Sequence, residues 1–315
     1  MPSDLQIQYV KAESIDREKW DRCIATAPNG IVYALSFYLD TMAPGWEALV
    51  LNDYEMVMPL PIRKKWGIRY IFQPSMTPIL GVFGAATDKN IVELFLRSIP
   101  KDLRLWDLSL NAANDASPAS YPLYRRTNCV LSLSPDYASL QNAYAENARR
   151  NIRKAIDTNC FVQKEVSISD IIAICRSEFP KFTKVEPGLF EKLDHIYHEP
   201  TLKKTSYGVY NEQGDLQASA AFIFFKQRVY YWLVGNKAES KKYNASYLLI
   251  DSMIRDYAGS ELILDFEGSD TKSVADFYLK FGAQPEYFTS IFDNRLPFPI
   301  SLLKKVPTQY GARIV

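Results

Sequence analysis

Short apolar runs separated by turns recur along the chain, and they limit it to folds in which β-sheets alternate with helices. The densest run, residues 218–225, has the length of a strand. Lys226 and Gln227 then turn the chain into a second apolar run at residues 229–234. Two such runs joined by a short turn are typical of a β-hairpin. No run approaches the ~18 apolar residues that a membrane-spanning helix needs.

The predicted elements follow a similar order in both halves of the chain: strand, two helices, antiparallel strands, helix, strand. The second half adds one more helix and strand. A repeated order predicts an α+β fold made by duplication of one unit. We therefore expect two domains, residues 1–134 and residues 135–315, with the boundary at Ser134 and Pro135.

The amino-acid composition limits the binding partners and the cellular compartment that we expect for this protein. The 37 Lys and Arg residues nearly balance the 36 Asp and Glu residues, which argues against a protein built to coat nucleic acid or an anionic membrane. The four cysteines lie far apart, so we expect buried free thiols in a reducing compartment. Residues 1–4 do not begin a secretory signal, and we expect a cytoplasmic protein.

Common catalytic motifs are missing from the sequence. It contains no Gly-x-Gly-x-x-Gly, no Walker loop and no Gly-x-Ser-x-Gly. The only two histidines, His195 and His198, are three residues apart before Pro200. This pair fits either a metal site on one helix face or an exposed polar helix end, and we expect no metal.

Three stretches of the second half carry a family resemblance. Residues 149–155 read Arg-Arg-Asn-Ile-Arg-Lys-Ala, residues 265–269 read Asp-Phe-Glu-Gly-Ser, and residues 275–282 form a helix with Tyr278 shortly before Gly282. On these stretches the chain resembles the FemAB-like branch of the GNAT superfamily of N-acyltransferases. The resemblance implies two tandem GNAT-like domains, each with a mixed, mainly antiparallel sheet flanked by helices.

The resemblance also implies an acyl-donor site in the second domain. In GNAT enzymes the junction between a strand and the next helix holds the pyrophosphate of coenzyme A on backbone N–H groups. Here Asn244 and Ser246 stand where that loop usually has small residues, and Asn tolerates the left-handed backbone that the loop needs. The expected donor-binding residues are Leu233, Val234, Gly235, Lys241, Lys242, Asn244, Ala245 and Ser246.

Three residues are candidates for proton transfer. Tyr278 matches the tyrosine that protonates the leaving thiolate in many GNAT enzymes, although it would equally suit packing on a sheet. Asp265 and Glu267 are two residues apart at a strand end, so both are expected on one face. They would either draw a proton from the amine through water or form a solvated strand end.

A basic cluster lies on a long helix predicted over residues 137–158. Its candidate substrate-binding residues are Arg149, Asn151, Arg153 and Lys154. The alternative is an exposed helix face paired with Glu146 and Asp157. Among the tryptophans we expect Trp46, Trp66, Trp106 and Trp232 in the core or on a sheet.

These features give one leading hypothesis and two alternatives. The leading hypothesis is direct transfer of an acyl group from acetyl-CoA, or another acyl-CoA, to the amine of a small molecule or peptide, without a covalent enzyme intermediate. The first alternative is a transferase that uses aminoacyl-tRNA as donor and a cell-wall precursor peptide as acceptor. The second is a binding module that has lost the donor loop.

Overall fold

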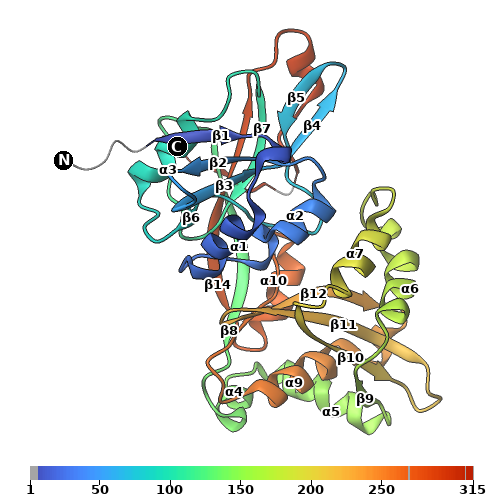
Figure 1. Ribbon diagram of the computed structural model, residues 1–315. Coiled ribbons are helices and arrows are strands. Elements are labelled where there is room, and N and C mark those ends of the chain that lie inside the picture. Colours follow the sequence, from blue (N-terminus) through green and yellow to red (C-terminus); the bar gives the residue numbers. More distant parts are fainter. Residues whose placement is uncertain (1–5, 269, 309, 315) are drawn as a thin grey trace. The chain divides into compact units, whose positions relative to one another are not determined.

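A computed structural model describes residues 6–268, 270–308 and 310–314 (Figure 1). Ser269, and residues 1–4 on which the expectation about a signal rests, lie outside this range. The chain forms two compact units, one holding the residues up to Thr127 and from Glu286 onward, the other holding residues 128–285. We call them unit 1 and unit 2. The expected domain division at residues 134 and 135 stays a prediction.

Unit 1 contains a four-stranded antiparallel sheet in the order β1-β2-β3-β6 and a second group in which β4 pairs with β5, β5 with β7, and β7 with β14. Its strands are β1 (Ile7–Val10), β2 (Glu47–Leu51), β3 (Met56–Leu60), β4 (Ile62–Lys65), β5 (Ile68–Ile71), β6 (Phe83–Gly84), β7 (Leu105–Leu110) and β15 (Arg313–Ile314). Its helices are α1 (Arg17–Thr26), α2 (Ser36–Met42) and α3 (Lys89–Arg97), with short 3-10 turns η1 (Ala12–Ser14), η2 (Val32–Ala34) and η4 (Ile300–Leu303).

Unit 2 contains a sheet in the order β8-β13-β12-β11-β10-β9, antiparallel except between β12 and β13. Its strands are β9 (Phe161–Lys164), β10 (Lys203–Tyr210), β11 (Leu216–Phe225), β12 (Arg228–Asn236) and β13 (Ile263–Asp265). Its helices are α4 (Tyr137–Asn142), α5 (Glu146–Asp157), α6 (Ile168–Glu178), α7 (Leu189–Tyr197), α8 (Ser240–Tyr243), α9 (Ala245–Tyr257) and α10 (Lys272–Leu279), with the turn η3 (Phe179–Lys181). The strands β8 (Leu123–Ser132) and β14 (Gln284–Asn294) carry the chain between the units.

Helices cover both faces of the sheet in unit 2. On one face α9 packs on β10 and β11, and α5 packs on α9; on the other face α6 packs on β12, with α7 beside it (Figure 1). Because side chains alternate along a strand, Ala218 and Ala220 point into the α9 core while Ser219 points toward α6. The predicted α+β class, with mixed and mainly antiparallel sheets flanked by helices, is confirmed.

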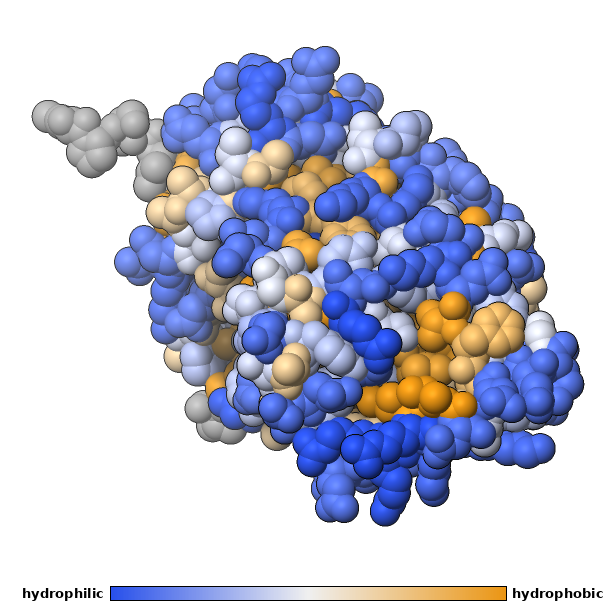
Figure 2. All heavy atoms as spheres, turned by 90° about the horizontal axis from the view of Figure 1, so that it is seen from below, coloured by the Kyte–Doolittle hydropathy of each residue, from blue (hydrophilic) through white to orange (hydrophobic). Residues whose placement is uncertain are grey.

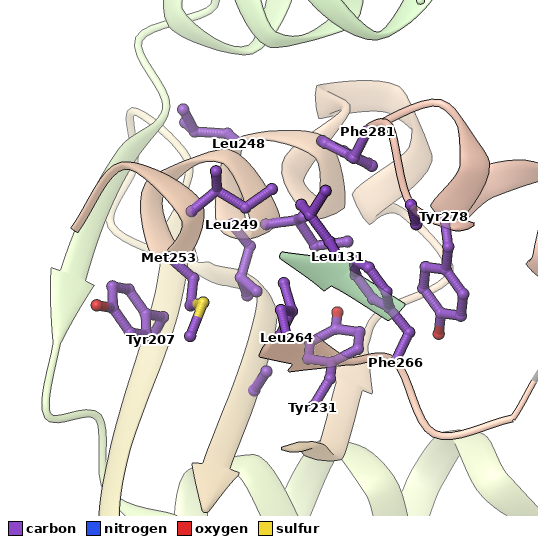
Figure 3. Close-up of a cluster of buried hydrophobic side chains, with 14 of the residues drawn as sticks. Leu131, Tyr207, Tyr231, Leu248, Leu249, Met253, Leu264, Phe266, Tyr278 and Phe281 are labelled. Atoms are coloured by element: carbon purple, nitrogen blue, oxygen red, sulfur yellow. The ribbon is translucent and has the colours of Figure 1, made fainter. Parts of the chain in front are cut away.

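The core of unit 2 lies between α9 and the sheet (Figure 3). Leu249 and Met253 of α9 are fully buried, and the rings of Tyr231, Phe266 and Tyr278 close one end of the cluster. Figure 2 shows the surface on the side where Figure 1 places α4, α5 and α9: most of it is hydrophilic, and it includes an orange, hydrophobic patch. The opposite, apolar face of these helices packs toward the sheet, and its burial is the main source of their stability.

Two sequence predictions about local structure are wrong. The long helix expected over residues 137–158 is broken into α4 and α5. At the break, the N–H of Ala145 donates to the carbonyl of Lys280, a bond that a continuous helix would not allow. Trp66 is not in the core or on a sheet but 75% exposed in the turn between β4 and β5.

Several other expectations are confirmed. The hairpin predicted around Lys226 and Gln227 is β11 and β12. Trp46, Trp106 and Trp232 are buried. All four cysteines are buried and free.

Candidate functional site

A strand in the middle of the unit 2 sheet, β12, loses its partner on one side after its first three residues. Its parallel pairing with β13 ends where Tyr230 lies opposite Asp265. On its other side the register with β11 shifts, because Tyr231 lies opposite Phe222 and Leu233 opposite Ala221. An extra residue of this kind bends a strand and increases its twist. The second half of β12 is therefore available to line a cavity.

A pocket of about 500 Å³ lies beside this half of β12. It is bordered by β12, the α8–α9 junction, α10 and one residue of α5, all within unit 2. Its lining residues are Asn151, Tyr231, Val234, Asn236, Ser240, Lys241, Asn244, Ser246, Tyr247, Ser273, Val274, Phe277 and Tyr278. The pocket is thus lined by aromatic and aliphatic side chains together with amide and hydroxyl groups. This composition suits a ligand with apolar and polar parts.

One wall of the pocket is the beginning of α9. Asn244 joins α8 to α9 in the left-handed conformation, with φ +53° and ψ +28°, as its position in the loop predicts. No side chain caps α9 in the described part of the chain, and Ser246 and Tyr247 of its first turn line the pocket, so the positive end of the helix dipole borders it. Lys241 adds a positive charge to the same wall. This end of the pocket can hold an anion.

Tyr278 of α10 forms the opposite part of the wall. Its ring stacks on Phe266 with 4.4 Å between the centroids and meets Tyr231 edge-on at 6.2 Å. Burial, followed by the neighbouring Cys129 and Glu267, raises the pKa of Tyr278 above its usual value. The phenol therefore stays protonated at neutral pH, in a position that borders the pocket, and can donate its proton.

Glu267 lies near Tyr278 without lining the pocket. Its Oε1 is buried and has no hydrogen-bond partner among the residues that the structure describes. Burial raises the pKa of Glu267 well above its usual value. Its backbone is also left-handed, with φ +61°. A buried carboxyl group in a left-handed turn is costly, and such costs gather at functional sites.

Asp265 has a different environment from Glu267, because β13 ends at Asp265 and the expected shared strand face does not form. Its carboxylate accepts hydrogen bonds from Asn128 Nδ2 at 2.8 Å, from the N–H of Glu267 at 2.9 Å and from Arg228 Nη1 at 2.6 Å. Burial raises the pKa of Asp265, and Arg228 and these N–H groups oppose the rise. The contacts hold the turn that presents Glu267.

Four residues expected at the donor site lie outside the pocket. Leu233 and Ala245 are buried in the core. Gly235 faces α6, where a Cβ would lie 3.0 Å from the carbonyl oxygen of Ile171. Lys242 is exposed, with its ammonium over the ring of Tyr243. Val234, Lys241, Asn244 and Ser246 do line the pocket.

The basic cluster of α5 is divided in the same way. Asn151 lines the pocket. Arg149 instead donates from Nη1 to the carbonyls of Asn142 at 3.1 Å and Tyr144 at 2.8 Å, so it closes the end of α4. Arg153 and Lys154 are exposed and lie outside the pocket.

Seven lining residues were not singled out from the sequence. Val274 and Phe277 lie four and one residues before Tyr278 on α10, so helical spacing carried a signal for the first of them. Asn236 carried no such signal in the sequence. Its buried Oδ1 has no hydrogen-bond partner in the described part of the chain. The others are Tyr231, Ser240, Tyr247 and Ser273.

Among the residues that the structure describes, no group of three His, Cys, Asp or Glu side chains is arranged to bind a metal ion. His195 and His198 are exposed, and His198 Nδ1 lies 2.8 Å from the carbonyl oxygen of Asp194. No helix in the same part of the chain has the length and apolar character needed to cross a bilayer.

Solved structures share this fold, whereas no protein-family model and no curated protein sequence matches the chain. A crystal structure of FemX aligns with a TM-score of 0.61 at 12% identity, over 95% of this chain and 99% of that one. The C-terminal domain of an Agrobacterium fabrum lysylphosphatidylglycerol synthetase homologue aligns with 0.53 at 10% identity, over 91% and 94%. Saccharomyces cerevisiae N-myristoyltransferase with bound myristoyl-CoA aligns with 0.50 at 11% identity, over 95% and 85%.

At these identities the comparisons establish the fold and no more. The fold is the α+β, GNAT-like one that the sequence predicts, shared over nearly the whole chain with FemX and N-myristoyltransferase. A role for the pocket has to be argued from its own residues.

Proposed function

We propose that the protein is an N-acyltransferase that transfers an acyl group to an amine by direct attack. The observation that carries this proposal is one pocket bordered by the uncapped start of a helix, beside Lys241, and by a buried tyrosine whose raised pKa keeps it protonated. An acyl donor with a phosphorylated carrier needs both features: a site for the phosphates and an acid for the leaving group. The shared fold with known transferases agrees with it.

The donor we favour is acetyl-CoA or another acyl-CoA. Its pyrophosphate would meet the start of α9 and Lys241, and its thioester arm would follow the part of β12 beyond its pairing with β13, past Val234 toward Tyr278. Ser246 and Asn151 supply polar contacts along the way. The buried Oδ1 of Asn236, unpaired among the described residues, is an acceptor that suits the amide N–H groups of such an arm.

The chemistry then divides between Tyr278 and Glu267. The amine nitrogen attacks the carbonyl carbon, a C–N bond forms, and the C–S bond breaks. Tyr278 gives its proton to the leaving sulfur. Glu267, whose raised pKa makes its carboxylate a stronger base, takes the amine proton through water. Asp265 holds the turn that carries Glu267.

Aminoacyl-tRNA is the second candidate donor, and the likeness to FemX over nearly the whole chain favours it. Under this alternative the acceptor is the amine of a cell-wall precursor peptide. Under the first, it is the amine of a small molecule or peptide. We place the protein in the cytoplasm, which its four buried free cysteines support.

The test is amine-dependent release of free thiol from acetyl-CoA, with polyamines, amino sugars and peptides as acceptors. Thiol release that requires both an amine and Tyr278 supports the acyl-CoA reaction. Binding of charged tRNA with no thiol release for any amine would favour the second donor. Neither thiol release nor binding of either donor would leave a non-catalytic module.

A further inference from the structure

A basic and apolar surface lies in unit 1 and includes none of the residues that line the donor pocket of unit 2. It has two parts, the hairpin of β4 and β5 and the segment 297–306 around η4. Ile300 packs against the same buried cluster as Ile68 and Tyr70 of β5, and Lys304 Nζ lies 5.3 Å from the ring centroid of Tyr70. The red segment beside the β4–β5 hairpin at the top of Figure 1 is this contact. We call the two parts together the tip surface.

Large apolar side chains point into solvent over the tip surface. Trp66 is 75% exposed and Phe298 is 81% exposed. Leu302 and Leu303 are exposed by 65% and 68%. Single exposed apolar residues are ordinary, but four large ones on two adjoining segments mark an interaction site.

Trp66 also occupies an unfavourable backbone position. It forms the two-residue turn of the hairpin with Gly67, at φ +52° and +80°. Such turns favour Asn or Gly at the first position, because a bulky side chain is strained in the left-handed region. The ring contacts Lys65, whose Nζ lies 4.7 Å from its centroid, and it is otherwise in solvent. A strained, exposed tryptophan indicates selection for contact with something outside the chain.

The charge of the tip surface is of one sign. Residues 62–71 and 297–306 contain six Lys and Arg residues and no Asp or Glu, in a chain whose net charge is +1. Among the described residues Arg69 pairs with Glu47 and Asp102. Lys64, Lys65, Lys304 and Lys305 are exposed and form no ion pair within the described part of the chain. The whole-chain balance therefore conceals a local excess of positive charge.

We propose that the tip surface docks on an anionic lipid bilayer. Lysines around exposed leucines and aromatic rings fit an interface in which the rings and leucines enter the headgroup region and the ammonium groups meet lipid phosphates. A nucleic acid would use the lysines and Trp66 but would leave Leu302 and Leu303 in water. The two aliphatic side chains therefore favour a membrane. The proposal does not depend on the acyl-transfer reaction.

The test is sedimentation of the full-length protein with vesicles of phosphatidylcholine, with and without roughly one-third phosphatidylglycerol, at about 0.1 M salt. We expect binding only to the anionic vesicles, weakened by added salt. Lys64→Glu with Lys65→Glu, and separately Leu302→Ser with Leu303→Ser, should each lower the partition coefficient at least about tenfold. A matched control is Phe182→Ser with Lys184→Glu, an exposed aromatic and lysine in unit 2. It should bind as the wild type does.

Tryptophan fluorescence provides a second readout. Trp66 is exposed and the other four tryptophans are buried, so quenching by brominated lipids reports on the tip surface. Trp66→Phe should abolish the quenching and leave the fold intact.

Three results would overturn the proposal. The first is a folded wild-type protein that does not bind anionic vesicles, or binds them no better than neutral ones. The second is binding of polyadenylate RNA, but not of vesicles, that is lost with Trp66→Phe. The third is self-association that is lost with Leu302→Ser and Leu303→Ser, which would make the surface an interface between copies.

Discussion

Burial acts on two neighbouring residues of the pocket region, Tyr278 and Glu267, and raises the pKa of both. For the phenol, the rise keeps the proton on the oxygen at neutral pH, so the hydroxyl can hydrogen-bond to a leaving sulfur and protonate it as negative charge develops there. For the carboxyl, the rise makes the carboxylate a stronger base. The residue types were predictable from the family resemblance. Their burial was not, since it depends on α10 and on the turn after β13.

Replacing Tyr278 with Phe tests the acid at this scale. The variant keeps the ring that stacks on Phe266 and removes only the hydroxyl. We expect kcat for thiol release to fall about 10²-fold or more, with donor affinity and melting temperature close to wild type. Steady-state kinetics and calorimetry would measure the three quantities. An unchanged kcat would remove Tyr278 from the mechanism.

Replacing Glu267 with Gln tests the cost of its burial. Because the folded-state pKa of Glu267 lies above the unfolded one, the contribution of Glu267 to the stability of the wild type is fully present below about pH 4 and is lost as pH rises through the folded pKa. The variant has no such loss. Melting curves should give equal stability near pH 4 and a more stable variant near pH 8, by about 1.4 kcal/mol for each unit of the rise. Equal pH dependence would contradict the assignment.

At the scale of elements, most strands and turns lie close to where the sequence predicts them, whereas one predicted long helix does not form as a single helix. The β11–β12 hairpin is fixed by local apolar runs and a short turn. The helix expected over residues 137–158 has no local breaker; its interruption comes from the bond between Ala145 and Lys280, which are far apart in sequence. The bulge in β12 that helps to form the pocket likewise has no local signal.

The backbone conformation of Asn244 sets the geometry of the junction between α8 and α9. Its left-handed conformation suits Gly and strains a β-branched residue. We expect Asn244→Gly to keep both stability and donor binding. Asn244→Val should cost about 1–2 kcal/mol and weaken donor binding. Thermal unfolding and titration of both variants check this, and a fully stable Asn244→Val would show that the turn is not strained.

Arg149 and Arg153 separate a structural role from a substrate role on one helix. Arg149 closes α4 through two carbonyls, so Arg149→Met should lower the free energy of unfolding by about 1–3 kcal/mol. Arg153→Met, at an exposed position, should change it by less than about 0.5 kcal/mol. Denaturant titration measures both. Equal stabilities, with a raised KM for Arg149→Met alone, would instead favour contact of Arg149 with substrate.

At the scale of the whole molecule, the order of elements was more informative than the identity of residues. Proteins only 10–12% identical share the fold over nearly the whole chain, because many sequences satisfy the same alternation of apolar strands and amphipathic helices. The return of the last residues, from Glu286 onward, to unit 1 was not predictable. It depends on pairing of β14 with β7, strands more than 150 residues apart. The positive tip surface was likewise concealed by a balanced total charge.

The most direct test of the donor pocket is calorimetric titration of acetyl-CoA into the wild type, Lys241→Glu and Lys242→Glu. The two lysines are adjacent in sequence, but only Lys241 lines the pocket. We predict binding to the wild type, a loss of at least about tenfold in affinity for Lys241→Glu, and near wild-type affinity for Lys242→Glu. Absence of binding at about millimolar donor, or equal losses in the two variants, would contradict the assignment of this pocket to acyl-CoA.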